Sequence, residues 1–210
     1  GGANYWARVF QRAGHSVKLI SPQFVKPFVK TNKNDANDAE AIVEAASRPS
    51  MNFVPIKQLE QQDIQSIQRV RSRVVKNRTA LINEIRGLIL EYGIIVTPGA
   101  TRVKRSLCGI IADRTNELTP LSRDCMQDLY DELVEVEARL KQLDKRVRQI
   151  CQQNETCCRI LKVPGVGELT ATAMVAAVPN ASEFSNGRHM SAWLGLVPRQ
   201  SSSGNKQKLL

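Results

Sequence analysis

The sequence predicts a mostly helical protein in three parts: a short α/β segment (residues 1–56), a long helical hairpin (57–154) and a small helical domain (155–210). Apolar residues recur at steps of three and four along two long stretches of the middle part, which is typical of amphipathic helices. Only 5% of the residues are aromatic, although 42% are hydrophobic. The core must therefore be built from Leu, Ile, Val and Ala, and this composition favours helices over a β-sandwich.

The first part reads as helix, strand, loop and helix. Residues 4–13 carry apolar side chains on one side of a short helix, and residues 16–20 (SVKLI) predict a short strand. After a loop with two prolines, Asn34 is suited to cap a helix that runs to about Ala46. This order of elements is typical of the edge of an α/β domain, not of a whole one.

The middle part contains two long helices, predicted over 59–92 and 122–152. In the second, apolar residues form a heptad seam that is sustained over more than three heptads: Met126, Leu129, Leu133, Val136, Leu140, Leu143, Val147 and Ile150. Two arrangements remain open at this point. The helices pair as an antiparallel hairpin within one chain, or their seams join copies of the chain into a dimer or tetramer.

The last part begins near residue 155 and contains a glycine-rich turn, Val163-Pro164-Gly165-Val166-Gly167, between apolar helical stretches. This pattern resembles a helix-hairpin-helix motif, in which glycines expose backbone N–H groups and a helix N-terminus faces a DNA phosphate. Gly165 and Gly167 are therefore candidate nucleic-acid contacts. The alternative is an ordinary turn, because pairs of glycines are common in turns.

The charge of the chain points to a polyanionic partner. Thirty Lys and Arg residues against twenty Asp and Glu residues give a net charge of +10, and such a surplus attracts phosphates. Residues 69–78 hold five basic side chains and no acidic one: Arg69, Arg71, Arg73, Lys76 and Arg78. We expect Arg71, Lys76 and Arg78 to form a stripe that follows a nucleic-acid backbone. The alternative is a solvated basic face.

Several other classes of protein are disfavoured. The sequence has no run of 18 apolar residues and no basic amphipathic helix with an aromatic face, so we expect no membrane partner. Five cysteines without a C-x-x-C pair, and only two histidines, argue against a zinc site and fit reduced thiols in a cytoplasm. The chain has neither a starting Met nor a signal peptide, so we expect it to be part of a longer protein.

Two carboxylates stand out in the first part. Asp35 and Asp38 are three residues apart, so on a helix they face the same side. Like charges at this spacing cost some stability, and a bound Mg²⁺ ion, which prefers oxygen ligands, would offset that cost. In phosphoryl transfer Mg²⁺ polarises the phosphate and activates the attacking oxygen. The alternative is an acidic first helical turn that the helix dipole favours.

Five stretches, in this order, resemble the DEDD transposases of bacterial insertion sequences, a family that also includes the Piv-type DNA invertases. The resemblance covers nearly the whole chain and rests on residues 3–8 (ANYWAR) with Gly14-His15, 33–39 (KNDANDA), 86–88 (RGL), 164–167 (PGVG) and 193–200 (WLGLVPRQ). It implies an RNase H-like domain whose four carboxylates bind Mg²⁺, then a coiled coil, then a C-terminal transposase domain. The first part of the chain would be a partial RNase H-like α/β edge.

The resemblance also implies roles for individual residues. Asp35 and Asp38 correspond to the third and fourth carboxylates, and the first two would precede Gly1. The family's strand-transfer nucleophile is a serine shortly before a glycine, which is Ser203 here, with Ser202 as the second choice. Arg199 lies beside it as a nucleic-acid contact.

The function implied is a transposase that binds DNA and carries out Mg²⁺-dependent strand cleavage and transfer through a covalent serine–DNA ester. The implied partners are the element ends, the target DNA and a structured guide RNA, and the place of action is the bacterial cytoplasm, at the nucleoid. With two of four carboxylates, we expect little or no activity from this chain alone. A non-catalytic nucleic-acid-binding fragment and a coiled-coil interaction protein are the alternative functions.

Overall fold

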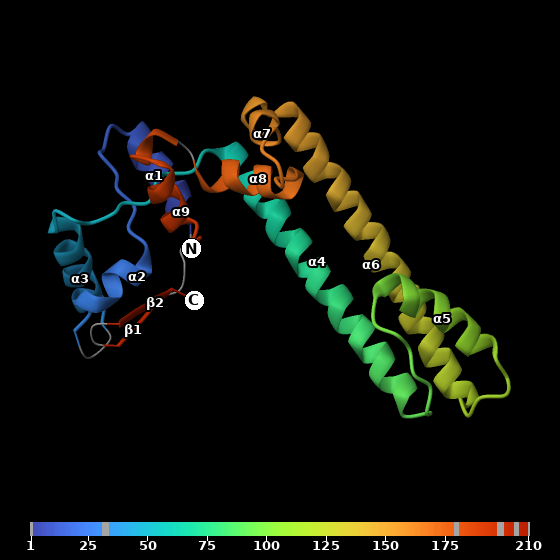
Figure 1. The fold of residues 1–210 in the computed structure, drawn as a ribbon. Coiled ribbons are helices and arrows are strands. Elements are labelled where there is room, and N and C mark those ends of the chain that lie inside the picture. Colours follow the sequence, from blue (N-terminus) through green and yellow to red (C-terminus); the bar gives the residue numbers. More distant parts are fainter. Residues whose placement is uncertain (1, 31–33, 179–180, 197–199, 204–205, 210) are drawn as a thin grey trace. The chain divides into compact units, whose positions relative to one another are not determined.

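The structure, a computed structural model, describes residues 2–30, 34–178, 181–196, 200–203 and 206–209 (Figure 1). The predicted class is confirmed, because helices dominate the described residues. The chain divides into two compact units, Gly1–Ala177 and Val178–Leu210. No helix among the described residues is long and apolar enough to span a membrane.

The first 56 residues form short helices joined by loops: α1 (Ala3–Arg12), α2 (Pro22–Val25), the 3-10 turn η1 (Lys26–Phe28) and α3 (Asp35–Ser47). Helix α1 ends at Arg12, and Gly14, which follows its C-cap Ala13, has a φ of 88° in the left-handed region that glycine tolerates. Asn34 caps α3 as predicted, since its Oδ1 atom accepts a hydrogen bond from the Asn37 amide at 2.7 Å. The cap fixes where α3 starts, and Asp35 is its first residue.

The strand predicted over residues 16–20 is wrong. The structure has a single bridge there, in which the Val54 amide donates to the Leu19 carbonyl at 2.7 Å. A strand needs a neighbour of comparable length, and no other run pairs with it in the described parts of residues 2–56. The predicted α/β edge is thus reduced to one bridge between helices.

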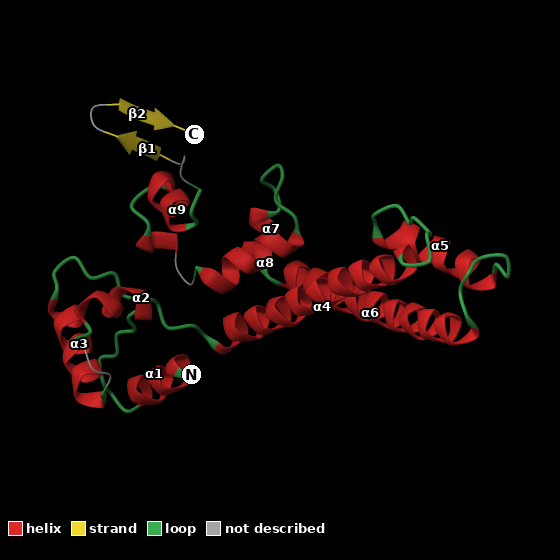
Figure 2. Ribbon diagram, turned by 90° about the horizontal axis from the view of Figure 1, so that it is seen from below, coloured by secondary structure: helices red, strands yellow, loops and turns green. Residues whose placement is uncertain are grey.

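The middle part is a helical hairpin made of α4 (Leu59–Leu90), α5 (Ala100–Ala112) and α6 (Pro120–Gln153). Helices α4 and α6 run antiparallel and lie side by side along much of their length (Figures 1 and 2). Thr119 caps α6, because its hydroxyl accepts a hydrogen bond from the Ser122 amide. Both long helices were predicted within two residues of these ends.

The seam between α4 and α6 holds the core. Val74 packs with Leu140 and Leu143, and nearer the tip of the hairpin a larger cluster is built from both helices and α5: Leu81, Ile82, Ile85, Ile89, Val96, Val103, Leu107, Met126 and Leu133. The seam is therefore closed within one chain. Of the two arrangements left open by the sequence, the structure has the hairpin.

At the other end of the hairpin, α7 (Glu155–Ile160) packs against α6, and α8 (Glu168–Ala177) packs against both α4 and α6. The buried residues Cys151, Cys157 and Ala171 form a small core there, and the Gln61 amide donates to the Val175 carbonyl at 2.9 Å. By compactness the chain therefore divides after Ala177. The three predicted domains, with a boundary near residue 155, stay a prediction.

The second unit is small. It contains the 3-10 turn η2 (Ala181–Glu183), α9 (Gly187–Trp193) and an antiparallel pair of strands, β1 (Gln200–Ser203) and β2 (Lys206–Leu209). Asn186 caps α9 by accepting a hydrogen bond from the His189 amide at 2.9 Å. The Phe184 ring packs edge-on against Trp193, with ring centroids 5.5 Å apart.

Candidate catalytic residues and nucleic-acid interface

Asp35 and Asp38 lie in the first turn of α3, where Asn34 caps the helix. Asp35 is exposed and Asp38 is half-buried. The Asp38 amide donates to the Asn34 carbonyl at 3.1 Å, which is the first bond of the helix. The cap and the helical spacing thus bring both carboxylates to one turn, as the sequence predicts.

Two carboxylates supply the hard oxygen ligands that suit Mg²⁺, but they fill only part of its octahedral shell. Among the described residues, no group of three or more His, Cys, Asp or Glu side chains is placed to hold a metal ion. Asp35 and Asp38 therefore fit one side of a metal site. The remaining ligands would be water, substrate phosphate or residues from elsewhere.

The predicted nucleophile lies in the second unit. Ser203 ends β1, where its backbone is in register with Lys206, and Ser202 is in register with Gln207. The side chains of both serines, and the whole of Arg199, lie outside the residues that the structure describes. Their predicted roles stay predictions.

The basic stripe expected on α4 is split by the hairpin. Arg71 is half-buried in the seam, where its Nε atom lies 2.5 Å from Oδ1 of Asp144 in α6. Arg78, one heptad later, is also half-buried, and its buried Nε atom has no hydrogen-bond partner among the described residues. Arg71 and Arg78 thus face α6, so they do not form one stripe with Lys76, because Lys76 is exposed.

The exposed basic residues of this stretch are Arg69, Arg73 and Lys76. They are spaced by four and three, so they share the face of α4 that points away from the seam. None of the three forms an ion pair within the described part of the chain. Partial burial, and then the nearby Arg69 charge, lowers the pKa of Lys57 from its ordinary value.

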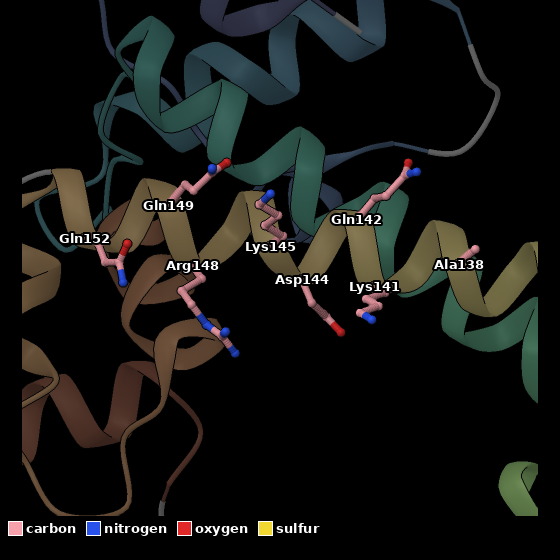
Figure 3. Close-up of a pocket in the computed structure, with 8 residues that line it drawn as sticks. All are labelled: Ala138, Lys141, Gln142, Asp144, Lys145, Arg148, Gln149 and Gln152. Carbon is pink, nitrogen blue, oxygen red and sulfur yellow. The ribbon is translucent and has the colours of Figure 1, made fainter.

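A second basic surface lies on α6. A groove of about 830 Å³ runs along residues 138–152 and is lined by Lys141, Lys145 and Arg148 together with three glutamines (Figure 3). The acidic residue in its lining is Asp144, which Arg71 binds from α4. The groove therefore carries a net positive charge.

The loop between α7 and α8 contains the predicted glycine turn. Gly165 has a φ of 85°, a backbone conformation that residues other than glycine rarely adopt. The Gly167 carbonyl accepts the first helical bond of α8, from the Ala171 amide at 2.9 Å. Helices thus flank the turn on both sides, while its role as a DNA-binding helix-hairpin-helix stays a prediction.

Sequence reasoning missed the basic side of α6. Residues 124–137 hold six acidic and no basic side chains, whereas 139–148 hold five basic and one acidic. This change of sign along one helix was a visible signal. The apolar seam alone predicts this helix, so the change of charge along it was not used.

A family model described as "Transposase", of the DEDD IS110 type, matches residues 2–94, and a model described as "Transposase IS116/IS110/IS902 family" matches residues 157–210. The chain thus matches two transposase domains of the IS110/IS116 family of insertion sequences. Asp35 and Asp38 fall within the first match, and Gly165, Gly167 and Ser203 fall within the second.

Curated relatives agree with the family models. The chain is 49% identical to the "Transposase for insertion sequence element IS1111A" of Coxiella burnetii over 210 residues, and 47% identical to the "Probable family 20 transposase" of Pseudomonas aeruginosa over the same length. Both alignments cover 100% of this chain, but only 58% and 62% of those relatives. The chain thus spans about three fifths of their length.

Proposed function

We propose that the chain is part of an insertion-sequence transposase that binds DNA and takes part in Mg²⁺-dependent strand cleavage and transfer. The observation that carries the proposal is the pair Asp35 and Asp38, held at one capped helical turn within a family match. The family resemblance supplies the rest of the proposed architecture. It comprises a partial RNase H-like catalytic domain (1–56), a coiled-coil region (57–154) and a transposase domain with a helix-hairpin-helix (155–210).

In this proposal Asp35 and Asp38 would hold Mg²⁺, and the ion, when bound, would supply polarisation of the scissile phosphate. The hydroxyl oxygen of Ser203 attacks the phosphorus atom, so that a serine–phosphate ester forms while the bond from phosphorus to a deoxyribose oxygen breaks. The Ser203 hydroxyl gives up its proton as it attacks, and the departing oxygen takes up a proton and leaves as a hydroxyl group, so that the protons balance. The ester keeps the energy of the broken bond for the transfer to a new strand.

The test is a cleavage assay in a protein extended to the length of its relatives, with Mg²⁺ and DNA that carries the element ends. We expect Asp38→Asn and Ser203→Ala each to reduce cleavage by at least about a hundredfold, because each removes a group that acts in the transition state. Asp63→Asn, at an exposed position of α4, is the matched control and should cleave normally. Full cleavage by the Asp38 and Ser203 variants would refute the proposal.

Binding without catalysis is a second candidate function for this chain by itself. It is favoured by the exposed Arg69, Arg73 and Lys76 on α4, which form no ion pair with any described residue. These cations suit the phosphate backbone of DNA or of a structured guide RNA. Homo-oligomers, also predicted, would form through outer faces of the hairpin, since the seam is closed within the chain. Because a transposase acts on chromosomal DNA, we expect the protein at the nucleoid in the bacterial cytoplasm.

A further inference from the structure

The groove along α6 and the glycine turn before α8 lie next to each other. We propose that together they form a continuous track for the phosphodiester backbone of a nucleic acid, separate from the basic face of α4. This inference rests on the proposed function, because it names the surface on which the nucleic acid lies. It assigns the contact to Lys141, Lys145 and Arg148, which the sequence analysis did not single out.

The first step in the argument is the geometry of α6. Lys141, Lys145 and Arg148 are spaced by four and three, so their side chains share one face of the helix. All three are exposed and line the groove (Figure 3). Seven residues of helix span roughly 10 Å. Phosphates repeat along one strand of duplex DNA every ~3.4 Å of axis. The stripe of Lys141, Lys145 and Arg148 can therefore reach two or three consecutive phosphates.

The second step is the charge of the groove. Its acidic residue, Asp144, is neutralised by Arg71, whose Nε atom lies 2.5 Å from the carboxylate. Polar lining comes from the amides of Gln142, Gln149 and Gln152, which donate hydrogen bonds to phosphate or sugar oxygens without regard to base sequence. A backbone phosphate would therefore meet cations and amide donors and no free carboxylate.

The third step links the groove to the turn. The Nε atom of Arg148 lies 3.5 Å from Oε1 of Glu168, the first residue of α8. The end of the basic stripe thus touches the start of α8, directly after the Gly165–Gly167 turn. Backbone amides in the first turn of a helix have no partner within the helix and attract phosphates. The Arg148 charge offsets the Glu168 carboxylate, which alone would repel a phosphate.

The test measures binding of the full chain to a fluorescent DNA duplex and to a fluorescent RNA hairpin across a salt series. The double variant Lys141→Gln/Lys145→Gln should weaken binding about tenfold or more near 100 mM salt and reduce the salt slope by roughly 1.8, which is ~0.9 for each lost phosphate contact. The matched control is Arg139→Gln/Arg146→Gln. It removes two exposed cations from another face of the same helix and should change affinity by less than about threefold.

A second variant tests the junction with α8. Glu168→Gln removes one negative charge and frees Arg148, so affinity should rise by a few-fold, an effect that lost folding would not produce. Equal losses in the two double variants, with no gain in Glu168→Gln, would overturn the track. If the unmodified chain binds neither probe, the proposed function fails as well. The probe that loses affinity in Lys141→Gln/Lys145→Gln identifies whether the track holds DNA or RNA.

Discussion

Two arginines, Arg71 and Arg78, show how a single residue can serve the fold where its charge suggests a ligand contact. They stand one heptad apart, at seam positions where an apolar residue is usual. Arg71 pairs with Asp144, whereas the buried Nε atom of Arg78 has no hydrogen-bond partner in the part of the chain that the structure describes. Charged seam layers add little stability, but they disfavour shifted pairings of the helices. The charge of these residues suggested either a nucleic-acid contact or a solvated face, whereas their heptad spacing places them in the seam.

The Arg71–Asp144 pair gives the first prediction at this scale. Arg71→Ala leaves Asp144 unpaired in the seam and should lower the free energy of unfolding by about 1–2 kcal/mol, since the pair is only partly shielded from water. The double variant Arg71→Met/Asp144→Leu should be as stable as the original chain or more so. Urea unfolding measures the free energy of unfolding of both variants. An Arg71→Ala variant as stable as the original would show that the pair contributes nothing.

The cysteines give a second prediction. Burial raises the pKa of Cys157 to about 12 and also raises that of Cys151. A raised pKa leaves less reactive thiolate at any pH below it, so at pH 8 both thiols should be nearly inert. A thiol reagent should label the three exposed cysteines of the native chain, Cys108, Cys125 and Cys158, quickly. All five should react in denaturant, and rapid labelling of five in the native chain would contradict the burial.

Whole elements were predictable where the sequence pattern is long. The seam of α6 and the breaks around α4 predicted two helices and their ends, and Asn34 predicted the start of α3. Short elements were not predictable in the same way. Helix α5 packs its apolar side into the larger core cluster through Val103 and Leu107. Because α5 is short and rich in basic residues, its sequence resembles that of a loop. The strand over 16–20 failed because strand pairing depends on distant residues.

The cap of α3 gives the prediction at the scale of elements. Asn34→Ala removes the hydrogen bond to the Asn37 amide and should destabilise the first turn by about 1 kcal/mol. Hydrogen exchange of amides at the start of α3 should therefore be several-fold faster. Asn52→Ala, at an exposed position outside any helix, is the control. Unchanged exchange in Asn34→Ala would mean that the cap does not hold the turn with Asp35 and Asp38.

At the scale of the whole molecule, the candidate site is divided among distant parts of the chain. The carboxylates lie in α3, the basic faces on α4 and α6, and the predicted nucleophile in β1 of the second unit. The carboxylates and the nucleophile were recognisable from family motifs, and the basic face of α4 from its charge, whereas the basic face of α6 was missed. Their assembly was not, because no local pattern encodes how an active site forms from separate segments, and the chain spans only about three fifths of its curated relatives.

The central claim is that a serine of this chain joins covalently to DNA with the help of Asp35 and Asp38. The most direct measurement uses the protein extended to the length of its relatives, incubated with Mg²⁺ and end-labelled DNA, then denatured and digested for mass spectrometry. The account predicts a nucleotide attached to Ser203 and none in the Asp38→Asn variant. A protein that cleaves DNA without any serine adduct, or with the adduct on a serine outside residues 201–203, would contradict it.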